Sequence, residues 1–352
     1  MALSRADFEK LKRIRKTFDE NYRITQLFSQ YLTYCPSLLE ARTVDALTAD
    51  GDLSREDAIA ALLSLALGVD DADADGRRLM RDYIRPAVQM LSAEKYYNDL
   101  YYTTVKIPES EQGRFSFKQQ TYPAYRAMIC DDIRADAAFR EVPCLGFFPH
   151  AFRFPAVLED GNEWMTLTPV DVDTCQDAIA EAHGHVVTFG LGLGYYAFHA
   201  ANKESVHTVT VVEKSRDVIE LFTTYLLPQF PGKEKIRIVE DDAFSYAEHV
   251  LPTLGADYVF VDTWRDASDG YPMYRRMKRL EHLCDGVPFS YWIEGFILSR
   301  MRAFVFEELW EREQNEPHGD TGTYTLEQLC ASLSDEGLRA RATREDYNEN
   351  DL

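Results

Sequence analysis

The chain has 352 residues, of which 45% are hydrophobic and 28% are charged, and its formal net charge is −21. This length and composition suit a globular protein of about two domains and exclude wholesale disorder. The negative charge disfavours a nucleic-acid partner, because an acidic surface without a concentrated basic patch repels phosphate backbones.

The six cysteines are scattered singly, and neither they nor the histidines show a spacing typical of metal ligands. We therefore predict reduced thiols and no metal site. The first residues lack the apolar run of a secretory leader, and no segment has the about 20 apolar residues that span a bilayer. These features lead us to expect a soluble, cytoplasmic protein with no membrane partner.

Residues 1–105 are predicted to form a helical N-terminal domain. Their apolar residues recur at helical spacing, and Ser54 with Asp57 opens one helix in a capping-box arrangement. Pro86 indicates a kink or a boundary in the helix that contains it.

Residues 106–174 are predicted to form a strand-containing connector. Two apolar, β-prone segments flank Gly161 and Asn162, a pair that is typical of a tight turn. This pattern predicts a β-hairpin.

From residue 175 onward, short apolar strands alternate with helices. This alternation predicts an α/β, Rossmann-like domain in which helices cover both faces of a mostly parallel sheet. We assign residues 175–352 to it, including a helical C-terminal extension. The arrangement after residue 287 stays open. The expected strands are 185–190, 207–215, 235–242 and 256–263, and a fifth candidate is 288–293.

The segment VVTFGLGLGYYAF, residues 186–198, places three glycines at alternate positions directly after the first of these strands. Gly190, Gly192 and Gly194 permit a left-handed backbone and would let a ligand lie against the main chain, Leu191 included. In open parallel sheets, ligands bind beyond the carboxyl ends of the strands. The spacing is GxGxG rather than GxGxxG, which makes NAD the weaker assignment. Glycines that serve only the turn and its packing are the alternative.

An acidic residue lies at the end of each of the next three strands. Glu213 can accept both hydroxyls of a ribose. The Asp242 carboxylate can accept a hydrogen bond from the exocyclic amine of adenine, and the amide of Ala243 can donate one to a ring nitrogen. Asp241 could take the place of Asp242 if the strand ends one residue earlier. Asp262, at the end of the fourth strand, faces the same ligand-binding cleft at the carboxyl ends of the strands if the strands pair in the expected register. Asp242 and Asp262 could equally cap the helices that follow them.

Together these residues resemble the Rossmann-like class I S-adenosylmethionine-dependent methyltransferases, over residues 175–295. VVTFGLGLG looks like the first motif of that family, although Thr188 stands where an acidic residue is often found. Glu213 falls where the family binds the ribose, Asp242 where it holds adenine, and Asp262 in the fourth motif near the acceptor. The resemblance implies S-adenosyl-L-methionine as cofactor and methyl transfer to a small molecule or a protein.

A narrower likeness exists to the spermidine synthase branch, which carries Asp-x-x-Asp after the fourth strand. Here Asp262 and Asp266 are one residue farther apart than in that pattern. Aminopropyl transfer is therefore the alternative reaction. Asp266 and Asp269 could line an acidic acceptor pocket or lie in an exposed loop.

Transfer from a sulfonium is an in-line displacement, so orientation and exclusion of water are the main tasks of such an enzyme. Asp262 and Asp266 are the candidates to deprotonate or position a nucleophile, and Trp264 is the candidate aromatic neighbour of the sulfonium. Core packing is the alternative for Trp264. Trp164 and Thr168 are candidates to cover the cofactor. A third hypothesis is a non-catalytic protein that binds the nucleoside and recruits a partner through its helical domain.

Overall fold

The computed structural model describes residues 2–344 of the chain, which divide into two compact units. We call Leu91–Ala124 with Phe148–Glu294 the sheet unit. The described part of the helical unit consists of residues 2–90, 125–147 and 295–344.

A five-stranded parallel sheet forms the centre of the sheet unit, in the order β10-β9-β8-β11-β12. This arrangement confirms the expected parallel sheet, and the candidate fifth strand pairs beside β11. The strand order reverses between β8 and β11, and such a reversal is where open α/β sheets bind ligands. The strands are β8 (Gly184–Phe189), β9 (Val206–Glu213), β10 (Ile236–Glu240), β11 (Tyr258–Val261) and β12 (Phe289–Tyr291).

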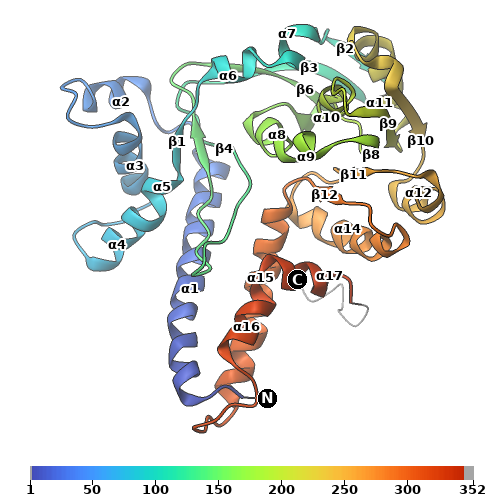
Figure 1. The fold of residues 1–352 in the computed structure, drawn as a ribbon. Helices are drawn as coiled ribbons and strands as arrows, with labels where there is room; N and C mark the ends of the chain where they lie inside the picture. The colour runs from blue at the N-terminus through green and yellow to red at the C-terminus, as the bar shows by residue number, and fades with distance from the viewer. Residues whose placement is uncertain (1, 345–352) are drawn as a thin grey trace. The chain divides into compact units, whose positions relative to one another are not determined.

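Helices cover both faces of this sheet (Figure 1). In the figure α9 and α10 lie on one side, and α12 and α14 lie on the other. Every residue of β11 is buried, as a strand covered on both faces requires. The helices of this unit are α6 (Ala93–Tyr97), α7 (Leu100–Thr104), α8 (Pro169–Asp173), α9 (Gln176–Glu181), α10 (Tyr195–Ala201), α11 (Arg216–Leu221), α12 (Ala243–His249), α13 (Leu251–Leu254) and α14 (Ala267–Leu280).

The same unit contains a four-stranded antiparallel sheet in the order β2-β3-β6-β7. Strands β6 and β7 form the predicted hairpin, turning at Asp160 and Gly161, both of which have positive φ. The strands are β2 (Ser110–Gln112), β3 (Phe115–Tyr122), β6 (Phe152–Glu159) and β7 (Asn162–Thr166).

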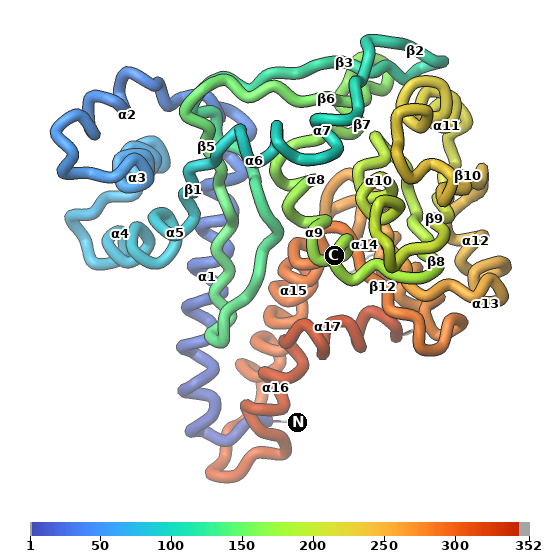
Figure 2. Tube along the Cα trace, turned by 45° about the horizontal axis from the view of Figure 1, so that its top comes forward, coloured from blue at the N-terminus to red at the C-terminus, as the bar shows by residue number. Residues whose placement is uncertain are grey.

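The helical unit is built around two long helices, α1 and α15, which lie side by side (Figures 1 and 2). Phe18 of α1 stacks on Phe306 of α15 with ring centroids 3.8 Å apart. The buried Arg302 pairs with the buried Glu141, which ties α15 to the segment before strand β5 (Leu145–Phe147). The helices are α1 (Arg5–Tyr34), α2 (Ala41–Leu47), α3 (Arg55–Ala66), α4 (Ala74–Leu79), α5 (Arg85–Ala87), α15 (Glu294–Asn315), α16 (Leu326–Leu333) and α17 (Asp335–Ala342).

A three-stranded sheet, β1-β5-β4, completes the helical unit. Pro86 lies in α5, and the chain becomes strand β1 two residues later, so the predicted boundary lies here. The Sγ atoms of Cys130 and Cys144 are 2.7 Å apart, a proximity that their spacing did not indicate. The strands are β1 (Val88–Met90), β4 (Met128–Ile129) and β5 (Leu145–Phe147). In the described part of the chain, no helix combines the length and the apolarity that crossing a bilayer requires.

Candidate functional site at the carboxyl ends of β8 and β11

The glycine loop connects β8 to α10, and its three glycines all have left-handed backbones. The φ angles of Gly190, Gly192 and Gly194 are 97°, 50° and 74°. A Cβ on Gly190 would collide with the carbonyl oxygen of Asp262, and one on Gly194 would collide with the ring of Phe222. Turn geometry and close contact with the protein's own atoms therefore account for two of the three glycines.

The remaining glycine, Gly192, lies against the thioether of Met165, which comes from β7. A Cβ on Gly192 would collide with the Met165 Sδ atom, and the amide of Leu193 donates a hydrogen bond to the same sulfur at 3.1 Å. The main chain that a ligand would use is thus covered by a side chain of the antiparallel sheet. Sequence reasoning considered Trp164 and Thr168 as covers and missed Met165 between them.

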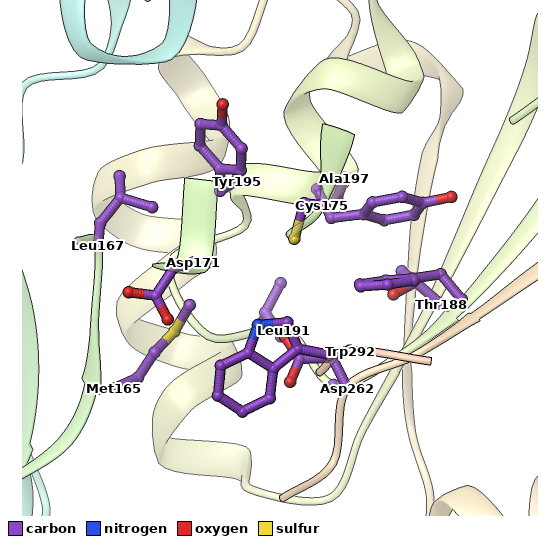
Figure 3. Close-up of a pocket in the computed structure, with 13 residues that line it drawn as sticks. Met165, Leu167, Asp171, Cys175, Thr188, Leu191, Tyr195, Ala197, Asp262 and Trp292 are labelled. Atoms are coloured by element: carbon purple, nitrogen blue, oxygen red, sulfur yellow. The ribbon is translucent and has the colours of Figure 1, made fainter. Parts of the chain in front are cut away.

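A small cavity of about 30 Å³ lies beside this loop. Its volume suits about two water molecules and not a nucleoside. In Figure 3, Met165 and Asp171 lie on one side of the Trp292 indole and Asp262 lies on the other. The lining residues are Met165, Leu167, Asp171, Cys175, Thr188, Gly190, Leu191, Tyr195, Tyr196, Ala197, Phe260, Asp262 and Trp292.

Asp262 brings an unusual carboxyl group to this cavity. Burial, together with the negative charges of Asp171 and Glu213, raises the pKa of Asp262 to about 8. Among the described residues, no group donates a hydrogen bond to its side chain. A half-buried carboxyl that faces a cavity and has no hydrogen-bond donor is a candidate functional group.

Asp171 is the second carboxyl of the cavity, and it comes from α8. Burial raises the pKa of Asp171 to about 6, against the effect of hydrogen bonds from Thr168 and Thr166. The Thr168 amide and hydroxyl both donate to its Oδ2 atom at 2.8 Å. The cavity lining holds these two acids and no lysine, arginine or histidine. Its electrostatic potential therefore favours a cation.

Glu213, the predicted ribose ligand, is buried at the end of β9. Its Oε2 atom accepts a hydrogen bond from the Leu191 amide at 3.2 Å, and its Oε1 atom accepts one from Ser215 at 2.7 Å. Burial raises the pKa of Glu213, although both of these amides oppose the shift. The carboxylate thus holds the glycine loop in place, and ribose binding by Glu213 stays a prediction.

Asp242 and Ala243, the predicted adenine ligands, lie at the start of α12. The Asp242 Oδ1 atom accepts hydrogen bonds from the amides of Phe244 and Ser245 at 3.0 and 3.1 Å. This is the helix-capping alternative of the sequence analysis, and neither predicted ligand lines the cavity.

Asp266 and Trp264, two of the predicted catalytic residues, also have structural partners. Asp266 forms a capping box with Asp269 at the start of α14. Trp264 is buried, and its Nε1 atom donates to the carbonyl of Trp292 at 3.2 Å. Of the three predicted catalytic residues, the structure brings only Asp262 to the cavity.

The structure adds Asp171, Cys175 and Trp292 to the candidate site. Asp171 lies three residues after Thr168, a spacing that predicts a helix start and gives no sign of a second role. Trp292 follows β12, whose position in the sheet the sequence left open. Within residues 2–344, no group of three or more potential metal ligands is present.

No protein-family model and no curated protein sequence matches this chain. Among solved structures, the chain is similar to spermidine synthase from Thermotoga maritima, at 16% identity and a TM-score of 0.32. That match covers 43% of this chain and 59% of the other. A spermidine synthase in complex with the transition state analogue AdoDATO matches at 16% identity and a TM-score of 0.31, covering 43% of this chain and 58% of the other. The chain therefore spans less than two thirds of either structure.

Proposed function

We propose that this chain is a transferase that uses a sulfonium nucleoside of the S-adenosylmethionine type. The observation that carries the proposal is the pair of enclosed carboxyls, Asp171 and Asp262, in a cavity without cationic side chains. They lie where the strand order reverses, beside a left-handed glycine loop. A sulfonium or an ammonium group is the chemistry that such a cavity would stabilise.

The residues fit this cofactor in their chemistry. The cavity of about 30 Å³ is too small for a nucleoside, so Met165 would have to move off the glycine loop before one could bind. A methionine side chain is unbranched and turns about three bonds, so its displacement from Gly192 costs little. Gly190 and Leu191 would then hold the nucleoside against the main chain, with Glu213 behind the loop. When bound, the group supplies an electrophilic carbon next to its positively charged sulfur.

Asp262 would handle the proton of the acceptor. A carboxyl with a pKa of about 8 exchanges protons near neutral pH, which suits a general base or acid. Asp171, which is held by Thr168 and Thr166, would keep its orientation while it faces the cationic acceptor. The indole of Trp292 closes the same cavity and would help to exclude water.

Two transferred groups are compatible with the motifs, and the charge of the cavity favours one of them. The glycine loop and strand-end acids predict methyl transfer from S-adenosylmethionine to a small molecule or a protein. That donor carries a carboxylate, for which the cavity lining offers no cation. A decarboxylated donor lacks the repelled group, so the acidic lining supports aminopropyl transfer to an amine.

The co-product of the reaction distinguishes these two transfers. The protein is incubated with S-adenosylmethionine or its decarboxylated form, each with putrescine and with an extract of small metabolites. Mass spectrometry then detects S-adenosylhomocysteine after methyl transfer and methylthioadenosine after aminopropyl transfer. We expect methylthioadenosine, and its absence together with S-adenosylhomocysteine production would leave methyl transfer as the function.

The thioether of Met165 over the glycine loop favours a second candidate, a nucleoside-binding protein without turnover. Calorimetry with S-adenosylmethionine, its decarboxylated form and methylthioadenosine separates the two candidates. Binding without either co-product would support the non-catalytic reading. An absence of binding to all three nucleosides would reject both.

A further inference from the structure

A second hollow, of about 540 Å³, lies in the sheet unit and shares no lining residue with the cavity of the candidate site. We call it the tyrosine groove. Its volume is in the range of small-molecule binding sites. The lining residues are Tyr97, Tyr101, Tyr102, Val105, Lys106, Ile107, Gln119, Arg153 and Pro155.

One face of the antiparallel sheet contributes Arg153, Pro155 and Gln119 to the groove. Arg153 and Pro155 are two residues apart on β6 and therefore point to the same face. Gln119 of β3 pairs directly with Pro155. The regular ladder between β3 and β6 thus fixes the positions of these three side chains relative to one another.

Three tyrosines from α6 and α7 supply the aromatic part of the lining, and their hydroxyls are already bonded. Tyr101 donates to the carbonyl of Leu193, and Tyr102 donates to the carbonyl of Leu167, both at 2.5 Å. The Tyr97 hydroxyl accepts a hydrogen bond from the Arg153 amide at 2.8 Å. Because these bonds fix the rings, the groove is pre-formed and loses little entropy when a ligand binds. Tyr97 remains 39% exposed.

The charge of the groove is opposite to that of the chain. The net charge of the protein is −21, yet the lining has two cationic residues, Lys106 and Arg153, and no aspartate or glutamate. Both cations are exposed, and among residues 2–344 neither forms an ion pair with a carboxylate. The Lys106 ammonium donates a hydrogen bond to the carbonyl of Tyr102 at 3.4 Å. By contrast, two other cations of this antiparallel sheet have acidic partners, because Arg114 pairs with Glu159 and Lys118 pairs with Glu111.

We propose that the tyrosine groove binds a small molecule that combines a planar aromatic ring with a phosphate or carboxylate group. The ring would lie against the tyrosines, where offset aromatic contacts add to the burial of apolar area. The guanidinium of Arg153 can form two parallel hydrogen bonds with such an anion, and Lys106 adds a second charge. The site is independent of the proposed transferase reaction.

Phenyl phosphate is the probe that tests this site. Benzoate is the second probe, and a comparison of the two affinities shows whether the groove prefers a phosphate or a carboxylate. Calorimetry on the full chain is expected to detect phenyl phosphate binding, with phenol and inorganic phosphate each at least about tenfold weaker. Arg153→Gln and Lys106→Gln are expected to weaken binding by about three- to tenfold each. Both residues are exposed, and the Arg153 amide keeps its bond to Tyr97, so both variants should fold.

Arg114→Gln and Lys118→Gln are the matched controls, because they remove the same charges from the same sheet outside the groove. They should bind phenyl phosphate as the parent does. The proposal is overturned if neither phenyl phosphate nor benzoate binds, if phenol binds as tightly as phenyl phosphate, or if the control variants lose as much affinity as the groove variants. Asp262→Asn, which alters the candidate transferase site, should leave phenyl phosphate binding unchanged.

Discussion

The carboxyl ends of β10 and β11 carry the same residue type and give it opposite environments. Asp242, just after β10, accepts hydrogen bonds from two amides at the start of α12. Asp262, just after β11, accepts none among the described residues and lines the cavity. The comparison shows that the same residue type at two strand ends of one parallel sheet caps a helix in one case and has no hydrogen-bond donor in the other.

The difference arises from where the next helix begins. Helix α12 starts one residue after Asp242, so its free amides lie within reach of that side chain. Helix α14 starts five residues after Asp262, and Asp266 caps it instead. Asp262 is left without local donors, in a half-buried position beside the cavity.

Asp262→Asn should give the largest effect of the variants considered. It should lower transferase activity and raise the stability of the fold. We expect transferase activity to fall by about a hundredfold or more, because the variant loses its proton-handling group. Turnover measured by co-product formation tests this, with Asp242→Asn as the matched control at the neighbouring strand end. An equal loss of activity in Asp262→Asn and Asp242→Asn would contradict the distinction between the two strand ends.

The stability of Asp262→Asn should depend on pH in a direction set by the raised pKa. An ordinary aspartate in the unfolded chain loses its proton at about pH 4, whereas burial and the charges of Asp171 and Glu213 raise the pKa of Asp262 to about 8. Between these values the folded state binds the extra proton, so the free energy of unfolding falls as pH rises. Asparagine cannot ionise. The variant should therefore melt about 2 to 5 °C above the parent at pH 8 and with it near pH 4.

Met165→Ala should uncover the glycine loop beside Asp262, and it therefore tests whether Met165 blocks a ligand at this strand end. If Met165 must leave before a nucleoside binds, its removal eliminates that conformational cost, and affinity should rise by about three- to tenfold. The same change should lower the free energy of unfolding by about 1 to 3 kcal/mol, because the side chain is half-buried.

Met277→Ala controls for the destabilisation, since Met277 is fully buried in α14 and does not line the cavity. It should lower the melting temperature without raising nucleoside affinity. If Met165→Ala binds more weakly than the parent, the thioether is part of the binding surface, and the covering role is wrong.

Much of this fold could be predicted from residues that act locally. Continuous apolar strands in alternation with helices are sufficient to indicate a parallel sheet, and Gly161 with Asn162 is sufficient to indicate the hairpin. Asp171 and Trp292 join Asp262 only through the packing of α8 and of the segment after β12, which lie far apart in sequence. The covering of Gly192 by Met165 likewise depends on how the antiparallel and parallel sheets pack together, which the spacing of residues in the sequence does not indicate. A Gly192→Val variant would for this reason disturb Met165 as well as any ligand.

Asp242 provides the smallest and most discriminating test. Replacing Asp242 with alanine removes the cap of α12 and should lower the free energy of unfolding by about 1 kcal/mol, measured by urea denaturation. Asparagine caps helices about as well as aspartate, so Asp242→Asn should unfold as the parent does. The two variants thus separate capping from adenine binding. If Asp242→Asn keeps the stability and loses nucleoside affinity, the carboxylate binds the base as the resemblance implies, and the two strand ends share one function. If both variants keep their nucleoside affinity, Asp242 only caps its helix. Asp262, which has no hydrogen-bond donor, then remains the candidate acid for ligand binding at these two strand ends.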